Sequence, residues 1–141
     1  MAKARKPKAQ AMDRKKITPR TMEELEARGY RVAKTEYWSP FPKPHGRRHD
    51  LFNCIDVLGV HPSRKENLGV QCTSRKNALA RVKKILRDTE VSPKARDWVK
   101  AGNKLEVWGW DRLGMKTRIL VVSIGVNLRG VLFAREAEEF M

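Results

Sequence analysis

Three polar side chains, Asp56, Gln71 and Thr73, stand in stretches of the chain that are otherwise apolar. Residues two apart on a strand point to the same face, so Gln71 and Thr73 share one face and can meet Asp56 from a neighbouring strand. Buried polar side chains are costly unless they are hydrogen-bonded or used. Carboxylate and carbonyl oxygens are the ligands that Mg²⁺ prefers. The pattern therefore predicts a divalent-metal site shared by two strands.

The elements that must position these residues are two apolar stretches, Leu51–Val60 and Leu68–Thr73, joined by a short polar turn. Strands joined by so short a turn are expected to be antiparallel neighbours. The other predicted elements are a helix that starts at a Thr21–Glu24 capping box and stops at Gly29, a strand Tyr30–Trp38, a helix Lys76–Thr89, a second helix opening at Ser92–Pro93, strands Leu105–Trp110 and Arg118–Val126, and a short terminal helix Arg135–Met141. The order αβββααββ predicts an α/β fold, a three-layer α/β/α domain with a mixed central sheet of about five strands.

The charge of the chain is strongly unbalanced: 31 Lys and Arg residues face 16 Asp and Glu residues, a formal net charge of +15. Such a field favours a polyanionic partner, and nucleic acid is the expected one. Residues 1–20 hold eight basic residues and one acid. We expect them to form a disordered basic arm before a single domain of residues 21–141. The arm fits phosphate contact, a solvated tail or an organelle-targeting segment.

The two cysteines, Cys54 and Cys72, are expected on opposite faces of the sheet and therefore as free thiols. Free thiols are typical of a reducing compartment. No apolar run is long enough for a membrane helix, and the N-terminus lacks an apolar signal core. These features predict a cytoplasmic protein that is not secreted and has no membrane partner.

Two basic surfaces are candidate nucleic-acid contacts. One is the proline-rich loop 39–49, which carries Arg47 and Arg48 and fits either substrate contact or a long solvated hairpin connection. The other is the exposed side of the 76–89 helix, which fits either phosphate binding or ordinary solvation. Its basic residues are Lys76, Arg81, Lys83, Lys84 and Arg87. The aromatic pair Trp108 and Trp110 fits either base stacking or the core.

The order and spacing of these stretches resemble the PD-(D/E)xK nuclease superfamily, and most closely its small resolvase-like endonucleases of phages and prophages. The resemblance covers most of residues 20–125. The segments that carry it are Gly29–Lys34, Asp50–Phe52, Ile55–Asp56, Leu68–Ser74, Ala80–Ile85 and Leu105–Trp110. It implies a restriction-endonuclease-like fold in a protein of a bacterial or phage-infected cell.

By that resemblance Asp56 binds Mg²⁺ or Mn²⁺, and the carbonyl groups of Gln71 and Cys72 complete the metal ligands. Gln71 and Thr73 occupy the places of the motif's acid and lysine, and Glu24 stands for an acid of the first helix. The chain departs from the motif, because Gln71 is neutral and Thr73 supplies no cation. Replacements for the lysine are expected on the next helix, and they are Lys76, Arg81 and Lys83.

Three functions follow as hypotheses. The first is a divalent-metal-dependent DNA endonuclease, with branched or junction DNA as one substrate class and DNA favoured over RNA. The second is a catalytically weak or inactive nuclease-fold protein that binds DNA or RNA without cutting. The third is an RNA-binding structural protein in which only the charge matters. A resolvase would require a homodimer to cut two strands symmetrically.

Overall fold

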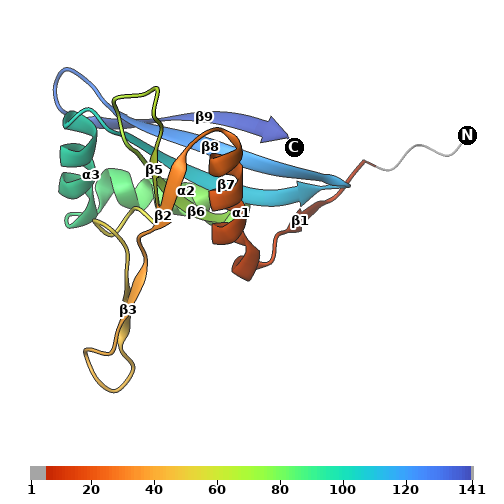
Figure 1. Cartoon of the computed structure of the whole chain (residues 1–141), viewed down its shortest axis with the longest axis horizontal. Coiled ribbons are helices and arrows are strands. Elements are labelled where there is room, and N and C mark those ends of the chain that lie inside the picture. The colour runs from red at the N-terminus through yellow and green to blue at the C-terminus, as the bar shows by residue number, and fades with distance from the viewer. Residues whose placement is uncertain (1–5, 141) are drawn as a thin grey trace, which may run out of the picture.

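The computed structural model describes residues 6–140, and within them it is an α/β protein with a seven-stranded mixed sheet and three helices (Figure 1). The elements are β1 (Ala9–Ala11), α1 (Arg14–Ala27), β2 (Arg31–Lys34), β3 (Tyr37–Ser39), β4 (Arg47–His49), β5 (Val57–Val60), β6 (Leu68–Ser74), α2 (Arg75–Arg87), α3 (Val91–Lys100), β7 (Lys104–Leu113), β8 (Lys116–Val126) and β9 (Leu132–Phe140). Within this part of the chain, no helix is long and apolar enough to cross a membrane.

The sheet has the strand order β2-β5-β6-β7-β8-β9, and β1 pairs with β7. β6 and β7 are parallel, in register from Leu68 opposite Lys104 to Ser74 opposite Trp110, and the other pairs are antiparallel. A parallel pair needs a crossover connection, and α2 with α3 supplies it. The sheet is larger than the five strands expected, because β1 and β9 add to it.

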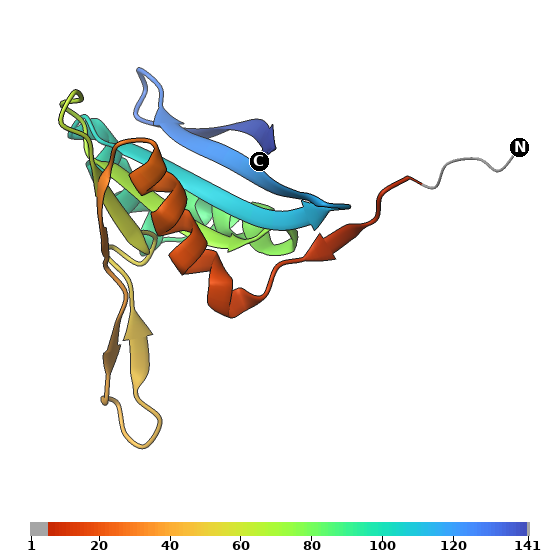
Figure 2. The ribbon, with the colours of Figure 1, turned by 45° about the vertical axis from the view of Figure 1, so that its right-hand side comes forward.

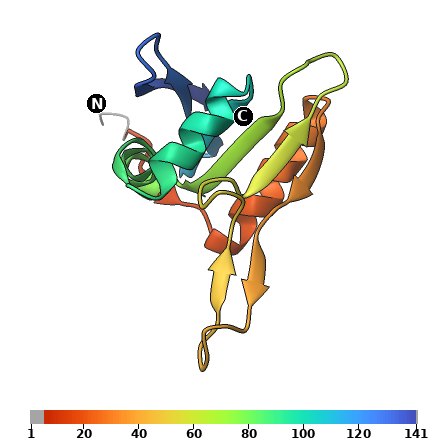
Figure 3. The same ribbon diagram turned by 90° about the vertical axis from the view of Figure 1, so that its left-hand side faces the viewer.

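Side chains that alternate along β7 divide the core into two clusters. Val107 packs in one cluster with residues of α2 and α3, whereas Trp108 packs in the other with Ile17 and Leu25 of α1. Successive residues of a strand point to opposite faces, so α1 covers one face of the sheet, and α2 and α3 cover the other (Figure 3). The predicted strands around Leu68–Thr73 and Leu105–Trp110 and the predicted helix after Lys76 are confirmed.

The first helix begins earlier than its sequence predicts. The side chain of Asp13 accepts a hydrogen bond from the backbone N–H of Lys15 at 3.0 Å and caps α1. Thr21 lies in the second half of the helix, so the predicted capping box is wrong. Arg14–Ala27 and β1 also order much of the segment that was expected to be a disordered arm, and the rest of that prediction, residues 1–5, lies outside the described residues. Gly29, with φ of 93°, follows the helix as expected.

Other predicted elements differ from the structure at their ends. Residues 51–56 were expected to be part of a strand, but they form a turn in which Phe52 and Asn53 have positive φ, and β5 begins only at Val57. The terminal segment forms β9, paired along β8, and not a helix. The stretch expected as one strand, Tyr30–Trp38, is divided between β2 and β3.

β3 and β4 form a two-stranded hairpin that projects away from the main sheet (Figure 2). Its register places Tyr37 opposite His49, Trp38 opposite Arg48 and Ser39 opposite Arg47. The predicted loop 39–49 is thus largely the tip and return strand of this hairpin. Its base joins the main sheet beside β2 and the turn before β5.

We expect Thr21→Val to lower the free energy of unfolding by about 1–3 kcal/mol, because a buried N–H loses its acceptor. Thr21 is fully buried; its Oγ1 donates to the carbonyl of Ile17 and accepts from Trp110 Nε1, both at 2.8 Å. Urea unfolding of Thr21→Val, Trp110→Phe and the double variant measures the coupling. A coupling near zero would contradict this role.

Candidate functional site

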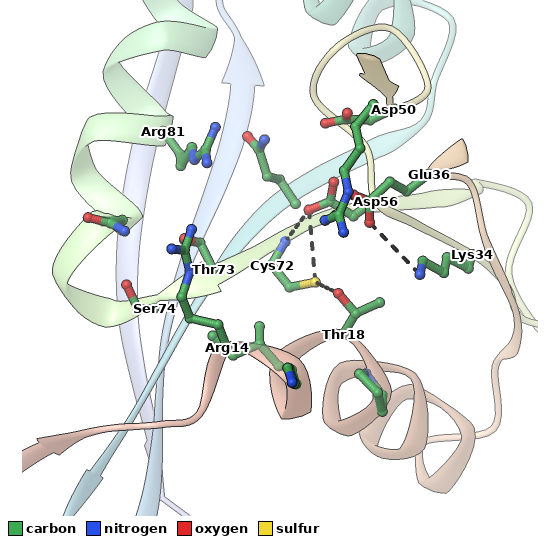
Figure 4. Close-up of a pocket in the computed structure, with 16 residues that line it drawn as sticks. Arg14, Thr18, Lys34, Glu36, Asp50, Asp56, Cys72, Thr73, Ser74 and Arg81 are labelled. Carbon is green, nitrogen blue, oxygen red and sulfur yellow. Dashed lines mark hydrogen bonds and ion pairs between the residues drawn. The ribbon is translucent and has the colours of Figure 1, made fainter. Parts of the chain in front are cut away.

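A pocket of about 750 Å³ opens where the first turns of α1, the end of β6, the start of α2 and the base of the hairpin meet (Figure 4). Asp56, Gln71 and Thr73 all line it. Gln71 and Thr73 are only 5% and 9% exposed, so they form its inner wall. The structure therefore brings together the three residues whose spacing first suggested a site.

The backbone of Asp56 is held from both sides. Its N–H donates to the carbonyl of Val70 in β6 at 2.9 Å, and its carbonyl accepts from the N–H of Thr35 at 2.9 Å. The paired part of β5 and β6 ends at Val57 opposite Val70. Asp56 is thus the first residue beyond the ladder, and its side chain points into the pocket.

The carboxylate of Asp56 replaces a backbone acceptor at the end of this ladder. Its Oδ2 accepts the N–H of Cys72 at 3.0 Å and lies 3.9 Å from the Cys72 sulfur. The N–H and C=O of one residue point to the same side of an extended strand, so the Cys72 carbonyl also faces this side, beyond the first residue of β5. That carbonyl is available as an oxygen ligand beside Asp56.

Two acids that the sequence did not predict for the site, Asp50 and Glu36, lie beside Asp56 and line the same pocket (Figure 4). The pKa of Asp56 is raised to about 7, chiefly because burial disfavours its charged form, and further because of Asp50 and Glu36. The hydrogen bond from Cys72 opposes this rise. Three carboxyl groups in one pocket form an environment that favours a cation.

Basic side chains surround these acids. Glu36 forms ion pairs with Arg48 at 3.0 Å and with Lys34 at 4.0 Å. The basic residues of the pocket are Arg14, Lys15, Lys34, Arg48 and Arg81, which come from α1, β2, β4 and α2. A pocket with acids at its base and cations at its rim suits a phosphate group bound beside a metal ion.

The structure does not bring the other predicted catalytic residues into this pocket. Glu24 forms ion pairs with Arg20 at 3.5 Å and Arg28 at 3.1 Å along α1 and does not line it. Lys76 lines a separate hollow beside β9, and Lys83 is exposed. Helix geometry explains the difference, because Asn77 and Arg81 are four residues apart on the flank of α2 that faces the pocket.

Of the predicted nucleic-acid contacts, Arg48 and Arg81 line the pocket. Lys84 follows Arg81 by three residues and lies on the same flank of α2. Arg47 and Arg87 are exposed outside the pocket.

The cysteines and tryptophans hold structural positions. Cys54 is buried in the cluster with α2 and α3, whereas Cys72 packs with the cluster of α1, so the expected separation of the two free thiols is confirmed. Burial, and then Asp56, raises the pKa of Cys72 to about 11, so its thiol stays protonated. Trp108 and Trp110 are 1% and 0% exposed, which excludes base stacking on them in this state.

The donor set of the pocket fits a hard divalent cation. Its oxygen donors are the carboxylates of Asp56, Asp50 and Glu36, the amide of Gln71 and the carbonyl of Cys72. Within residues 6–140, no group of three or more His, Cys, Asp or Glu side chains is already close enough to hold a metal ion. The amide oxygen of Gln71 and the carbonyl of Cys72 would add neutral oxygen donors to the acids of such a site.

We expect Asp56→Asn to change how stability depends on pH. A carboxyl whose pKa is raised on folding binds its proton more tightly in the native state. The free energy of unfolding of the wild type therefore falls as the pH rises from about 4 to about 7. Asn keeps the acceptor for Cys72 but removes the charge. The difference in free energy of unfolding, variant minus wild type, should therefore be about 2–4 kcal/mol more positive at pH 8 than at pH 4.

The measurement is urea unfolding of both proteins at several pH values without divalent metal. Asp50→Asn serves as a second variant, because removing that neighbouring charge should lower the pKa of Asp56 and shift the transition to lower pH. Parallel pH profiles for wild type and Asp56→Asn would contradict the raised pKa.

No protein-family model matches the chain, and neither a curated protein nor a solved structure matches it. Conclusions about function therefore rest on the residues of the pocket and on the charge of the chain.

Proposed function

We propose that the protein is a divalent-metal-dependent DNA endonuclease whose active site is the pocket around Asp56. The observation that carries the proposal is the arrangement of Asp56, Asp50 and Glu36 within a rim of basic side chains. Acids at the base suit Mg²⁺ or Mn²⁺, and cations at the rim suit the phosphates of a polyanion. The net charge of +15 supports a nucleic-acid substrate.

The fold supports the same proposal. We place it with three-layer α/β/α proteins of the restriction-endonuclease-like kind, which the sequence resembles. Antiparallel β5 and β6 carry Asp56 and the Gln71-Cys72-Thr73 stretch to one place, and β7 is parallel to β6. This is the arrangement that the resemblance to PD-(D/E)xK nucleases implies for the metal-binding motif.

A bound metal would be held by Asp56, the amide oxygen of Gln71 and the carbonyl of Cys72, with Asp50 and Glu36 adding negative charge. The metal would polarise the scissile phosphate and lower the pKa of a water molecule. Gln71 lacks the charge of the motif's usual acid. Asp50 and Glu36 compensate for this loss, and they replace Glu24 as the additional acids.

Arg81 takes the place of the missing lysine in this proposal. Thr73 provides only a hydroxyl, whereas Arg81 reaches the pocket from α2 on the same side as Asn77. A guanidinium is always charged near neutral pH and binds phosphate oxygens in a bidentate manner. Arg14, Lys15 and Lys34 extend the basic rim of the pocket, where they would contact further phosphates of the bound DNA strand.

The second candidate function is binding without cutting. The neutral Gln71, and the ion pairs that already occupy Glu36, favour it. In that case the pocket would hold a phosphate through its basic rim alone. A homodimer is required only if the protein cuts both strands of a junction symmetrically, so it belongs to the nuclease proposal and not to the binding function.

Incubation with linear, supercoiled and four-way-junction DNA in Mg²⁺ or Mn²⁺ tests the proposal. We expect metal-dependent cleavage by wild type and a loss of at least about 100-fold in Asp56→Asn, because the variant removes the charged metal ligand. The same metals should raise the melting temperature of wild type and not that of Asp56→Asn. Equal DNA binding by both proteins, with cutting by neither, would favour the binding function and contradict the nuclease.

Two variants of α2 test the role of Arg81. Arg81→Ala should lower cleavage by about 10–100-fold, because a cation that contacts the reacting phosphate is lost. Lys83→Ala removes the same charge from an exposed position of the same helix, outside the pocket, and is expected to change cleavage by less than about threefold. Equal losses in both variants would show that α2 acts only through its overall charge.

A further inference from the structure

The β3–β4 hairpin carries an unusual surface for a projection that contacts little of the core (Figures 2 and 3). Tyr37, Trp38 and Phe41 are 61%, 61% and 63% exposed. Large aromatic rings at such exposure are costly in water unless a partner covers them. The hairpin therefore has the composition of a binding surface.

The face of the hairpin that carries Trp38 also carries a residue of the pocket. Trp38 pairs across the hairpin with Arg48, so the two side chains share one face. Arg48 lines the pocket and forms an ion pair with Glu36 at 3.0 Å. The exposed indole therefore shares a face of the hairpin with a basic side chain that reaches the pocket.

The indole of Trp38 is also held in place. A Cβ atom added to Gly46 would lie 2.4 Å from Cζ2 of Trp38, so the ring rests directly on the backbone of this glycine. Gly46 has φ of 67°, a conformation that glycine adopts without strain. Neighbouring Tyr37 stacks on His49 with ring centroids 5.0 Å apart. Rings held in this way lose little entropy when a partner binds.

The charge of the hairpin selects the kind of partner. From residue 37 to residue 49 the chain has three basic residues, Lys43, Arg47 and Arg48, and no acid. Nζ of Lys43 lies 5.8 Å from the ring centroid of Phe41, so charge and aromatic surface are interleaved. Exposed rings beside basic groups are typical of surfaces that stack on unpaired bases and follow the phosphate backbone. A continuous duplex offers no free base faces to such rings.

We propose that the hairpin binds unpaired nucleotides next to the strand held in the pocket, with Trp38 stacking on a base. The preferred substrate class is then DNA with a single-stranded or branched segment, rather than continuous duplex. The position of this contact beside the reacting strand rests on the proposed function, whereas the stacking does not. Phe41 and Lys43 at the tip extend the surface to a further nucleotide.

Binding of labelled DNA to the full chain without divalent metal tests the proposal, since no cutting then interferes. The probes are a single-stranded oligonucleotide, a forked DNA and a blunt duplex of the same sequence. Trp38→Ala should weaken binding of the first two by about 10-fold and of the duplex by less than about twofold, as expected for the loss of one stacked base. Trp38→Phe should restore most of the affinity, because it keeps an aromatic face.

Leu128→Ala is the matched control, because Leu128 is a fully exposed apolar residue at the β8–β9 turn, away from the pocket and the hairpin. It should leave all three affinities unchanged. Intrinsic fluorescence adds a second readout: quenching by single-stranded DNA should fall sharply in Trp38→Ala, since Trp108 and Trp110 are buried and Trp98 is half-buried on α3. Equal melting temperatures for wild type and variant establish that the hairpin variant is folded.

Three results would overturn the proposal. Equal weakening for duplex and single-stranded DNA would assign the hairpin a general electrostatic role. Unchanged affinities would remove it from binding. A change of oligomeric state in Trp38→Ala would assign the rings to a contact between two copies of the chain. Selective loss of single-strand binding in a protein that cuts no DNA would support the hairpin and refute the nuclease, so the two proposals are tested separately.

Discussion

The site depends on one hydrogen bond, from the N–H of Cys72 to the carboxylate of Asp56 at 3.0 Å. β5 begins only at Val57, whereas β6 continues past it, so β6 would otherwise present a part-buried donor without a partner, at a cost of about 1–3 kcal/mol. The carboxylate satisfies that donor and is itself fixed beside Gln71 and the carbonyl of Cys72. The same interaction therefore ends a strand pair and aims an acid into the pocket, although burial and two neighbouring acids raise its pKa to about 7.

Sequence patterns predicted the elements that are decided by periodicity, and they failed where contacts distant in the sequence decide. β6, β7 and α2 follow from apolar spacing. Asp56, Gln71 and Thr73 line one pocket, but Asp56 does so from the turn before β5 and not from the strand on which it was predicted. Residues 51–56 are also largely apolar, but they form a turn. Cys54 and Ile55 are buried in it, and the bridge between Leu51 and Ile55 joins two residues of the turn itself. The end of the chain is polar and was expected to be a helix, yet pairing with β8 makes it a strand.

The acids of the site show the same limit. Glu24 was expected there by resemblance, but α1 begins at Arg14, and Glu24 is paired with Arg20 and Arg28 along that helix. Asp50 and Glu36 reach Asp56 because the turn before β5 and the end of β2 meet at the base of the hairpin, which no periodicity reveals. On α2 the spacing of Asn77 and Arg81 does identify the flank that faces the pocket, once the position of the helix is known.

Glu36 belongs to both parts of the proposed binding surface, because it lines the pocket and pairs with Arg48 of the hairpin. Arg48 is 74% exposed, and an ion pair of that kind contributes only about 0–1 kcal/mol. The ion pair alone thus does not hold the hairpin in position. The base of the hairpin is instead fixed by the chain on either side of it: Thr35, before β3, donates its N–H to the carbonyl of Asp56, and Asp50, after β4, lies beside Asp56. The backbone that positions Asp56 therefore also sets the position of the hairpin and its aromatic rings.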